Sequence, residues 1–159
     1  MSIDPDTFRS VLGRFASGVT IITTRDENGQ DHGMTVSAFS ALSLTPPMVL
    51  ACIDRSAGMY DVLKRTGFFT VNILSSPQEA LSRRFSDVEA QMRFDGIGYT
   101  RGPKGAPILD DVLAIMECTL VTCVDGGDHG VFIGAVETAV TAELRPLLYY
   151  RGGYAQLER

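Results

Sequence analysis

The sequence has no tryptophan, only two histidines and only three cysteines among its 159 residues. The histidines are His32 and His129, and the cysteines, Cys52, Cys118 and Cys123, form no Cys-x-x-Cys pair. A zinc site needs several clustered His, Cys or acidic ligands, so we expect no metal centre. Each cysteine lies in an apolar, strand-like run, which indicates buried free thiols in a reducing compartment, here the cytoplasm.

The sequence also lacks a block of basic residues and any long apolar run. Its 14 Lys and Arg against 19 Asp and Glu give a formal net charge of −5, whereas nucleic-acid binding needs a basic footprint. No apolar run approaches the roughly 20 residues that span a bilayer. The acidic start leads into an amphipathic segment, not a signal peptide. We therefore expect neither nucleic acid nor a membrane as a partner.

The overall composition is that of a globular protein, with 45% hydrophobic and 21% charged residues. The length suits one domain with a hydrophobic core, and neither a repeat nor a low-complexity linker interrupts it. Residues 1–159 are therefore predicted to form a single domain. Residues 87–110 are rich in Gly and Pro and predict a surface excursion or lid rather than a boundary, because strand-like segments lie on both sides.

Strand-like segments outnumber helical ones. A first helix is predicted from an N-cap at Asp4 and a proline at Pro5, with an apolar stripe at helical spacing that begins at Phe8 and ends at Phe15. Strands are predicted over residues 19–24, 33–37, 48–53, 68–74, 114–124, 131–141 and 147–150. Without strand–helix–strand alternation, this order favours an antiparallel barrel or sandwich.

Four local predictions accompany this order of elements. The apolar run 48–53 is typical of a strand buried on both faces. Ser56 is predicted to cap a short helix, and residues 76–79 are predicted to form a capping box before another. Residues 125–130 are predicted to join the two long strands as a hairpin loop.

Several catalytic motifs are missing. The sequence has no G-x-G-x-x-G before a helix, no phosphate-binding P-loop and no G-x-S-x-G nucleophile elbow. A thiol triad of Cys52, His129 and Asp128 is conceivable. However, Cys52 lies inside an apolar run, where burial raises the pKa of a thiol and makes it inert.

Four stretches are difficult to explain by core packing alone. Residues 33–47 are rich in small hydroxyl side chains and include two prolines, and residues 52–56 open a predicted helix, whose N-terminus favours an anion. Residues 82–85 contain an arginine pair suited to phosphate. Residues 127–129 place a histidine on a glycine-rich loop. Taken singly, each stretch has an ordinary structural explanation.

In this order and spacing the stretches resemble the short-chain flavin reductase family, the small reductase components of two-component flavin monooxygenases. The resemblance runs through residues 8–24, 33–40, 44–47, 69–74, 78–85, 117–118, 127–129 and 146–154. It implies an FMN-binding split barrel, that is, a mainly β, antiparallel Greek-key barrel with short flanking helices. It also implies a homodimer, because such flavoproteins build their sites near a two-fold axis.

The resemblance also assigns roles to individual residues. His129 matches the position where the nicotinamide is expected to stack. The residues expected to bind the flavin ring, ribityl chain, phosphate and adenine are Thr35, Val36, Ser37, Ala38, Ser40, Cys52, Ile53, Asp54, Ser56, Arg83, Arg84, Phe85 and Tyr154. Backbone N–H groups of residues 37–40 are the expected donors to the ring edge that becomes negative on reduction.

The implied reaction is hydride transfer from NADH, or NADPH, to FMN or FAD, with the reduced flavin passing to a separate monooxygenase. The sequence does not choose between the two flavins, or between exchanging substrate and bound cofactor. The main alternative is a non-catalytic flavin carrier on the same barrel, which would need no nicotinamide site at His129. A split-barrel oxidase of a pyridoxine-type phosphate would need more basic residues than the sequence offers.

Overall fold

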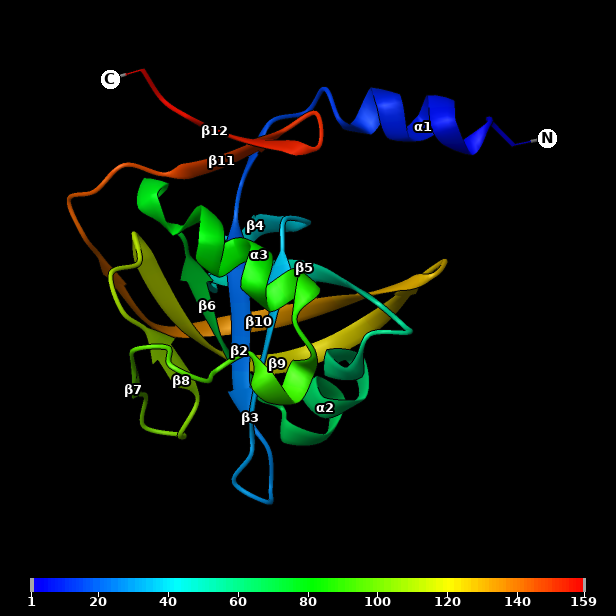
Figure 1. Ribbon diagram of the computed structural model, residues 1–159. Helices are drawn as coiled ribbons and strands as arrows, with labels where there is room; N and C mark the ends of the chain where they lie inside the picture. The colour runs from blue at the N-terminus through cyan, green and yellow to red at the C-terminus, as the bar shows by residue number, and fades with distance from the viewer. Residues whose placement is uncertain (1, 159) are drawn as a thin grey trace.

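The protein, seen in a computed structural model that describes residues 2–158, is built mainly of antiparallel strands (Figure 1). The strands are β1 (Ser17–Gly18), β2 (Thr20–Arg25), β3 (Asp31–Val36), β4 (Phe39–Ser43), β5 (Met48–Asp54), β6 (Phe68–Ile73), β7 (Tyr99–Arg101), β8 (Pro107–Leu109), β9 (Ala114–Gly126), β10 (His129–Thr141), β11 (Leu147–Tyr150) and β12 (Gly153–Gln156). The helices are α1 (Pro5–Leu12), α2 (Gly58–Thr66) and α3 (Glu79–Asp87), with 3-10 turns over Ser76–Gln78 and Ala90–Met92. No helix in this part of the chain is long and apolar enough to cross a membrane.

Seven strands form the main sheet in the order β3-β2-β6-β9-β10-β5-β4. Its two edge strands, β3 and β4, are joined by only Ser37 and Ala38, so the sheet must curve until its edges meet. The Cys52 N–H donates to the Ala38 carbonyl at 2.9 Å, which fastens this corner to β5. The predicted antiparallel split barrel is confirmed.

Two hydrophobic cores lie on opposite faces of the curved sheet. The larger fills the barrel and is centred on Phe69 and Phe132, both fully buried. The smaller packs α3, β11 and the 94–112 segment against the outside, around Phe85. Since strand side chains alternate between faces, one strand such as β2 supplies both cores, with Ile22 inside and Ile21 outside.

Of the four local predictions, three need correction or refinement and the hairpin is confirmed. β5 is buried on one face only, because Val49, Ala51 and Ile53 enter the core while the alternate residues stay half-exposed. Ser56 does not cap α2, whose N-cap is Ala57 without a side-chain bond. The capping box consists of Ser75 and Gln78, one residue earlier than predicted. The β9–β10 hairpin is present and turns tightly at residues 127–128.

The first helix has the predicted N-cap, but its apolar stripe is exposed, whereas such a stripe usually packs against a hydrophobic core. The Asp4 carboxylate accepts from the Thr7 N–H at 3.0 Å, as the cap requires. No residue of α1 is buried, and the helix extends away from the barrel beside β11 and β12 (Figure 1). Phe15, which follows the helix, is 82% exposed. The apolar stripe therefore faces out of this chain and not into its core.

Candidate functional site

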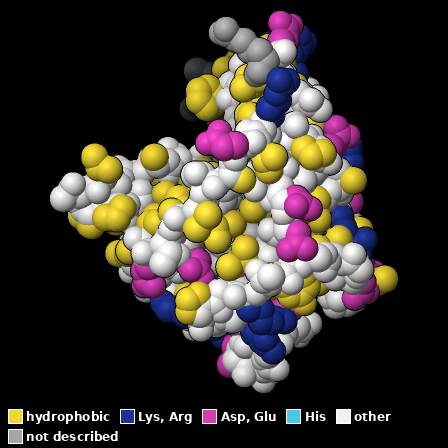
Figure 2. Space-filling model, turned by 90° about the vertical axis from the view of Figure 1, so that its left-hand side faces the viewer, with side chains coloured by type: hydrophobic (Ala, Val, Ile, Leu, Met, Phe, Trp, Pro, Cys, Tyr) yellow, Lys and Arg dark blue, Asp and Glu magenta, His cyan; other side chains and the backbone are white. Residues whose placement is uncertain are grey.

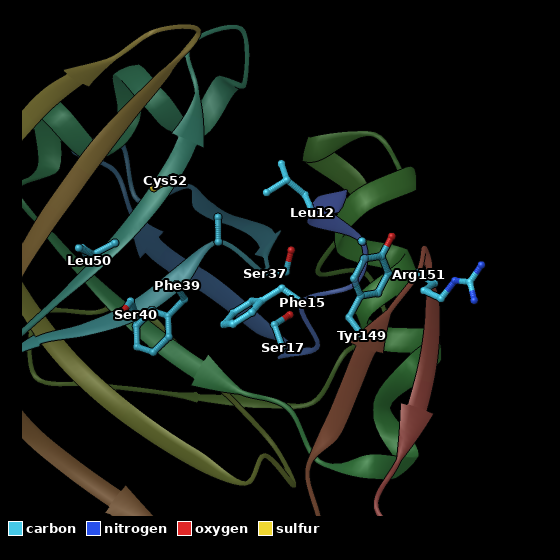
Figure 3. Close-up of a pocket in the computed structure, with 12 residues that line it drawn as sticks. Leu12, Phe15, Ser17, Ser37, Phe39, Ser40, Leu50, Cys52, Tyr149 and Arg151 are labelled. Atoms are coloured by element: carbon cyan, nitrogen blue, oxygen red, sulfur yellow. The ribbon is translucent and has the colours of Figure 1, made fainter. Parts of the chain in front are cut away.

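Three cavities border residues 35–38 at the corner between β3 and β4: Ser37 and Ala38 line the first, Thr35 lines the second, and Thr35 with Ser37 lines the third. The first has a volume of about 510 Å³ and lies between the β4–β5 edge and the segment that follows α1 (Figure 3). Its lining is mostly apolar with a few polar groups, as is usual for a cofactor site. It is lined by Leu12, Gly13, Phe15, Ser17, Ser37, Ala38, Phe39, Ser40, Leu50, Cys52, Tyr149 and Arg151.

The corner itself offers backbone donors to this cavity. Ser37 and Ala38 lie outside the strands, and within residues 2–158 their N–H groups donate no hydrogen bond. Their neighbours are committed, since the Phe39 N–H donates to the Ser37 carbonyl at 2.9 Å. Backbone donors seek partners in a folded protein, so a ligand with acceptor atoms at its edge fits here. A flavin ring has such an edge, and the apolar walls suit its faces.

The second cavity, of about 390 Å³, lies on the other side of the corner. Thr35, the N-terminus of α2 at Ala57 and Gly58, and Arg93 line it. The Arg93 guanidinium donates to the Gly33 carbonyl at 2.7 Å and the Val88 carbonyl at 2.9 Å, which leaves further N–H groups for a ligand. Burial lowers the pKa of Arg93, and it stays a cation. A helix N-terminus and a guanidinium together suit a phosphate.

A hydrogen-bonded chain supports the wall between these cavities and lines a third of about 160 Å³. The Thr35 hydroxyl donates to the Ser82 carbonyl at 2.7 Å, and the hydroxyls of Ser82 and Tyr154 are 2.7 Å apart. The Arg83 guanidinium lies 4.9 Å from the centre of the Tyr154 ring. β12, which the sequence did not predict, thus brings Tyr154 to the corner beside Thr35.

The β5–α2 loop has its own internal bonds. The Asp54 carboxylate accepts from both the N–H and the hydroxyl of Ser56, each at 2.8 Å. These two bonds, with a smaller contribution from His129, hold the pKa of Asp54 below its usual value. Asp54 is therefore a carboxylate at neutral pH. This contact shapes the loop and uses both the N–H and the hydroxyl of Ser56. The predicted anion-binding role would therefore fall to other groups of the loop.

His129 lies at the start of β10, opposite Asp54 on β5. Further along the same pair of strands, Val131 faces Cys52 and Ile133 faces Leu50. Opposed residues share a face, and Leu50 and Cys52 line the first cavity, so His129 continues that lining by about 7 Å. Its Nδ1 lies 2.8 Å from Asp128 Oδ1, and its side chain is 40% exposed.

Four of the residues singled out in the sequence have side chains occupied elsewhere. Val36 and Ile53 point into the barrel core. Phe85 is buried against Gly33, where an added Cβ would come within 2.6 Å of its ring, and it forms only the base of the second cavity. Arg84 donates three hydrogen bonds to the carbonyls of residues 92, 93 and 95. Its guanidinium holds the 3-10 turn in place.

Sequence reasoning missed several residues of the site. Phe15, Tyr149 and Arg151 line the first cavity, and His32 and Arg93 line the second. The sequence shows the apolar stripe that ends at Phe15, but the pattern alone does not predict that Phe15 lines a cavity. Within residues 2–158, no group of three or more His, Cys, Asp and Glu side chains could hold a metal ion.

Comparison with known proteins identifies the class of the protein. A family model described as a flavin reductase like domain matches residues 12–158. The reductase subunit HsaB of a flavin-dependent monooxygenase from Rhodococcus jostii strain RHA1 is 44% identical over 158 residues, which cover 99% of this chain and 80% of the relative. A flavin reductase from Pseudomonas putida is 40% identical, over 96% of this chain and 90% of the relative.

Solved structures agree with the sequence relatives. The NADH:FAD oxidoreductase SgcE6 of Streptomyces globisporus C-1027 superposes with a TM-score of 0.93 at 32% identity, covering 100% of this chain and 98% of that one. The same enzyme in complex with NAD and FAD fragments gives a TM-score of 0.91, over 99% of this chain and 96% of that one.

The chain therefore belongs to the family of flavin reductase like domains. The prediction of an NAD(P)H-dependent flavin reductase is confirmed, and it is favoured over the alternative of a non-catalytic flavin carrier.

Proposed function

We propose that this protein uses NADH to reduce FMN or FAD held in the first cavity and hands the reduced flavin to a separate monooxygenase. The observation that carries the proposal is the corner at residues 35–38: within the described part of the chain the N–H groups of Ser37 and Ala38 donate no hydrogen bond, and they border a cavity of about 510 Å³ with apolar walls. The relatives named as reductase subunits of monooxygenases support the partner. When bound, the flavin ring accepts a hydride from the reduced nicotinamide.

The chain's own residues provide placement. Ser37 and Ala38 would donate their N–H groups to the ring edge, where negative charge develops on reduction. Phe15, Phe39 and Leu50 would exclude water from the ring, which strengthens these hydrogen bonds. Ser40 and Cys52 would complete the wall of the first cavity. Thr35, which lines the neighbouring second cavity, would be held by Tyr154 through Ser82.

The phosphate end of the flavin is assigned to the side of the corner that carries positive charge. Asp54 and Ser56 would shape the loop along the ribityl chain. The N-terminus of α2 and Arg93 would bind phosphate in the second cavity, with Phe85 beneath it. Arg83 would reach the same region from above the Tyr154 ring, whereas Arg84 would act only by holding the 3-10 turn.

His129 is proposed as the nicotinamide contact, because it extends the face that lines the first cavity. A stacked ring places the reacting atoms close together without an acid–base group from the protein. The choice between NADH and NADPH would depend on free cations near the ribose. Arg55 and Arg101 are paired with Asp125 and Asp31, which favours NADH. Arg151 at the first cavity is the cation to test for contact with a 2′-phosphate.

A homodimer is part of the proposal. α1 presents Phe8, Val11 and Leu12 to the outside, and Phe15 continues their stripe to the rim of the first cavity. Apolar side chains are also spread over the face shown in Figure 2 and over the lobe that projects from it. A second copy packed on α1 would bury the stripe and close the cavity, as an isologous two-fold contact does. Single-domain organisation over residues 1–159 and a cytoplasmic location, in keeping with three free thiols, complete the proposal.

The test is NADH oxidation by the purified protein with FMN, with FAD and without flavin. We expect rapid oxidation only with flavin, and the two rates give the flavin preference. His129→Ala should raise KM for NADH about tenfold while the flavin dissociation constant changes less than about twofold. Unchanged NADH kinetics in this variant would remove His129 from the nicotinamide site, and flavin binding without any NADH oxidation would contradict the function itself.

A further inference from the structure

A single arginine fastens the turn that carries His129. The Arg55 N–H donates to the Asp128 carbonyl at 3.0 Å, and its Nε donates to the Gly127 carbonyl at 3.0 Å. Its Nη2 donates to Asp125 Oδ1 at 2.7 Å. Arg55 therefore binds three of the four residues that precede His129, and the β9–β10 turn is tied to the end of β5.

The hydrogen bonds of Arg55 to backbone carbonyls fix the position of the turn more firmly than its exposed ion pair with Asp125 would do alone. Asp125 is 83% exposed, and a surface pair of this kind contributes little on its own. The bonds to the carbonyls of Gly127 and Asp128 are independent of that pair. Gly127 has a φ of +71°, the left-handed region that glycine adopts without steric penalty, and this lets the chain turn tightly just before His129.

The same turn rests on the Tyr60 ring. The Arg55 guanidinium lies 5.9 Å from the centre of that ring, and the Cys123 thiol donates to the Tyr60 hydroxyl at 3.8 Å. At Gly130, an added Cβ would come within 2.6 Å of the Tyr60 ring. The hairpin end thus lies over the Tyr60 ring, is paired to β5 from His129 onward, and is held ahead of that pairing, at residues 125–128, by Arg55.

Arg55 also stands between two residues of the proposed flavin site. Asp54 and Ser56, on either side of it, are joined by hydrogen bonds of 2.8 Å that shape the β5–α2 loop. A displacement of the Arg55 backbone would move both this loop and the turn. The loop proposed to border the flavin and the turn proposed to border the nicotinamide are connected through this one residue.

From this geometry we infer that Arg55 is a positioning residue for nicotinamide binding: it holds the 125–128 turn so that His129 faces the first cavity. The inference rests on the proposed role of His129 and adds a residue that touches neither flavin nor nicotinamide. Substitution of Arg55 removes its two side-chain bonds and keeps the backbone bond to Asp128, and it leaves the flavin wall at residues 35–38 intact, because the hydrogen bonds described for that wall do not involve Arg55.

The experiment compares KM for NADH, kcat and the flavin dissociation constant in Arg55→Ala, Arg55→Lys, Asp125→Asn and His129→Ala. We expect Arg55→Ala to raise KM for NADH about fivefold to tenfold, with kcat and flavin affinity within about twofold, since weakened placement is lost binding and not lost chemistry. Arg55→Lys should recover part of the loss, and Asp125→Asn should cost about twofold because it removes only the exposed pair. Arg65→Ala, which breaks an exposed pair with Glu27, is the matched control and should change nothing.

The double variant Arg55→Ala/His129→Ala separates the possible failures. If Arg55 acts through His129, its substitution adds no further loss once His129 is gone. An equal loss in both backgrounds, or an unchanged KM in Arg55→Ala while His129→Ala raises it, overturns the inference alone. An unchanged KM in His129→Ala overturns the proposed nicotinamide contact and the inference with it. Hydrogen exchange of residues 125–130 should quicken in Arg55→Ala while β6 stays protected, which shows that the fold is intact.

Discussion

Two cysteine residues on the main sheet illustrate how strongly the surroundings of a thiol determine its reactivity. Cys118 on β9 is buried, and this burial, with the nearby carboxylates of Glu137 and Glu117, raises the pKa of its thiol to about 12. Cys52 on β5, which was predicted from its apolar run to be buried and inert, is instead half-exposed and lines the first cavity. Since the thiolate is the reactive form, the two residues should respond differently to alkylating reagents.

We predict that iodoacetamide at mildly alkaline pH modifies Cys52 and leaves Cys118 unmodified until the protein is unfolded. Excess FMN or FAD should slow modification of Cys52 severalfold, because the flavin is proposed to cover it. Mass spectrometry of the digested protein measures both, with Cys52→Ala as the control for the assignment. A labelling rate at Cys52 that ignores flavin would place the ring outside the first cavity.

Neighbouring residues of one sequence motif can have different environments, so a motif cannot be assigned to a site as a whole. The hydroxyl-rich stretch was identified as a site, and Thr35, Ser37, Ala38 and Ser40 do line cavities. Val36 belongs to the same stretch but points into the core, because strand side chains alternate. Arg84 could not have been placed from sequence, since its partners are carbonyls of a segment eight to eleven residues away.

At the scale of elements, an ion pair is one of the contacts that hold the glycine- and proline-rich segment 87–110 to the sheet. Arg101 on β7 donates two hydrogen bonds to the Asp31 carboxylate on β3, at 2.7 and 2.8 Å, and the Tyr99 hydroxyl donates a third at 3.0 Å. Burial opposes ionisation of Asp31, but these bonds outweigh it and the pKa of Asp31 lies below its usual value. The segment is therefore an ordered excursion.

Asp31→Asn should destabilise the protein by about 1–3 kcal/mol at neutral pH, because it removes charge-assisted bonds from a mostly buried group. A carboxyl with a lowered folded-state pKa stabilises above its unfolded pKa, about 3.9, and loses this contribution as the pH falls through the folded value. The difference from wild type in chemical denaturation should therefore stay constant down to about pH 5 and shrink below about pH 4. Asp95→Asn, on the same segment, is the control. A difference that persists unchanged in acid would mean that the ion pair is not its cause.

The order of most elements could be predicted because their patterns are local. β-branched content marked the long strands, and Asp4 with Pro5 marked the first helix. β12 escaped prediction because Gly153–Gln156 has no strand pattern of its own. It forms because Arg151 and Gly152 adopt positive φ values, which turns the chain back onto β11.

At the scale of the whole molecule, packing within the described part of a single chain does not explain the apolar stripe of α1, because no residue of this helix is buried. The sequence predicted the apolar stripe without saying what it packs against, and the structure leaves it exposed beside the first cavity. No sequence pattern separates a stripe that packs within a chain from one that packs against another copy, because both bury the same kind of surface. The proposed homodimer gives this stripe a partner.

We predict that a double variant, Phe8→Glu with Val11→Glu, converts a dimer into a monomer, because two charges would enter the apolar contact. Light scattering coupled to size-exclusion chromatography measures the mass. The monomer should also bind flavin more weakly, since Leu12 and Phe15 line the cavity that the second copy would close. Ser10→Glu, on the polar side of α1, is the matched control and should remain dimeric. A wild-type monomer would end the dimer proposal.

The shared corner at residues 35–38 limits how this protein can be redesigned. Because three cavities meet there, a substitution that changes its path alters ring, phosphate and Tyr154 contacts together. Cofactor preference is adjusted more safely on walls that a single cavity uses, Phe15 for the first and Arg93 for the second. We therefore expect residues 35–38 to tolerate few substitutions, and differences in sequence between flavin reductases of this fold should lie mainly in the residues around them.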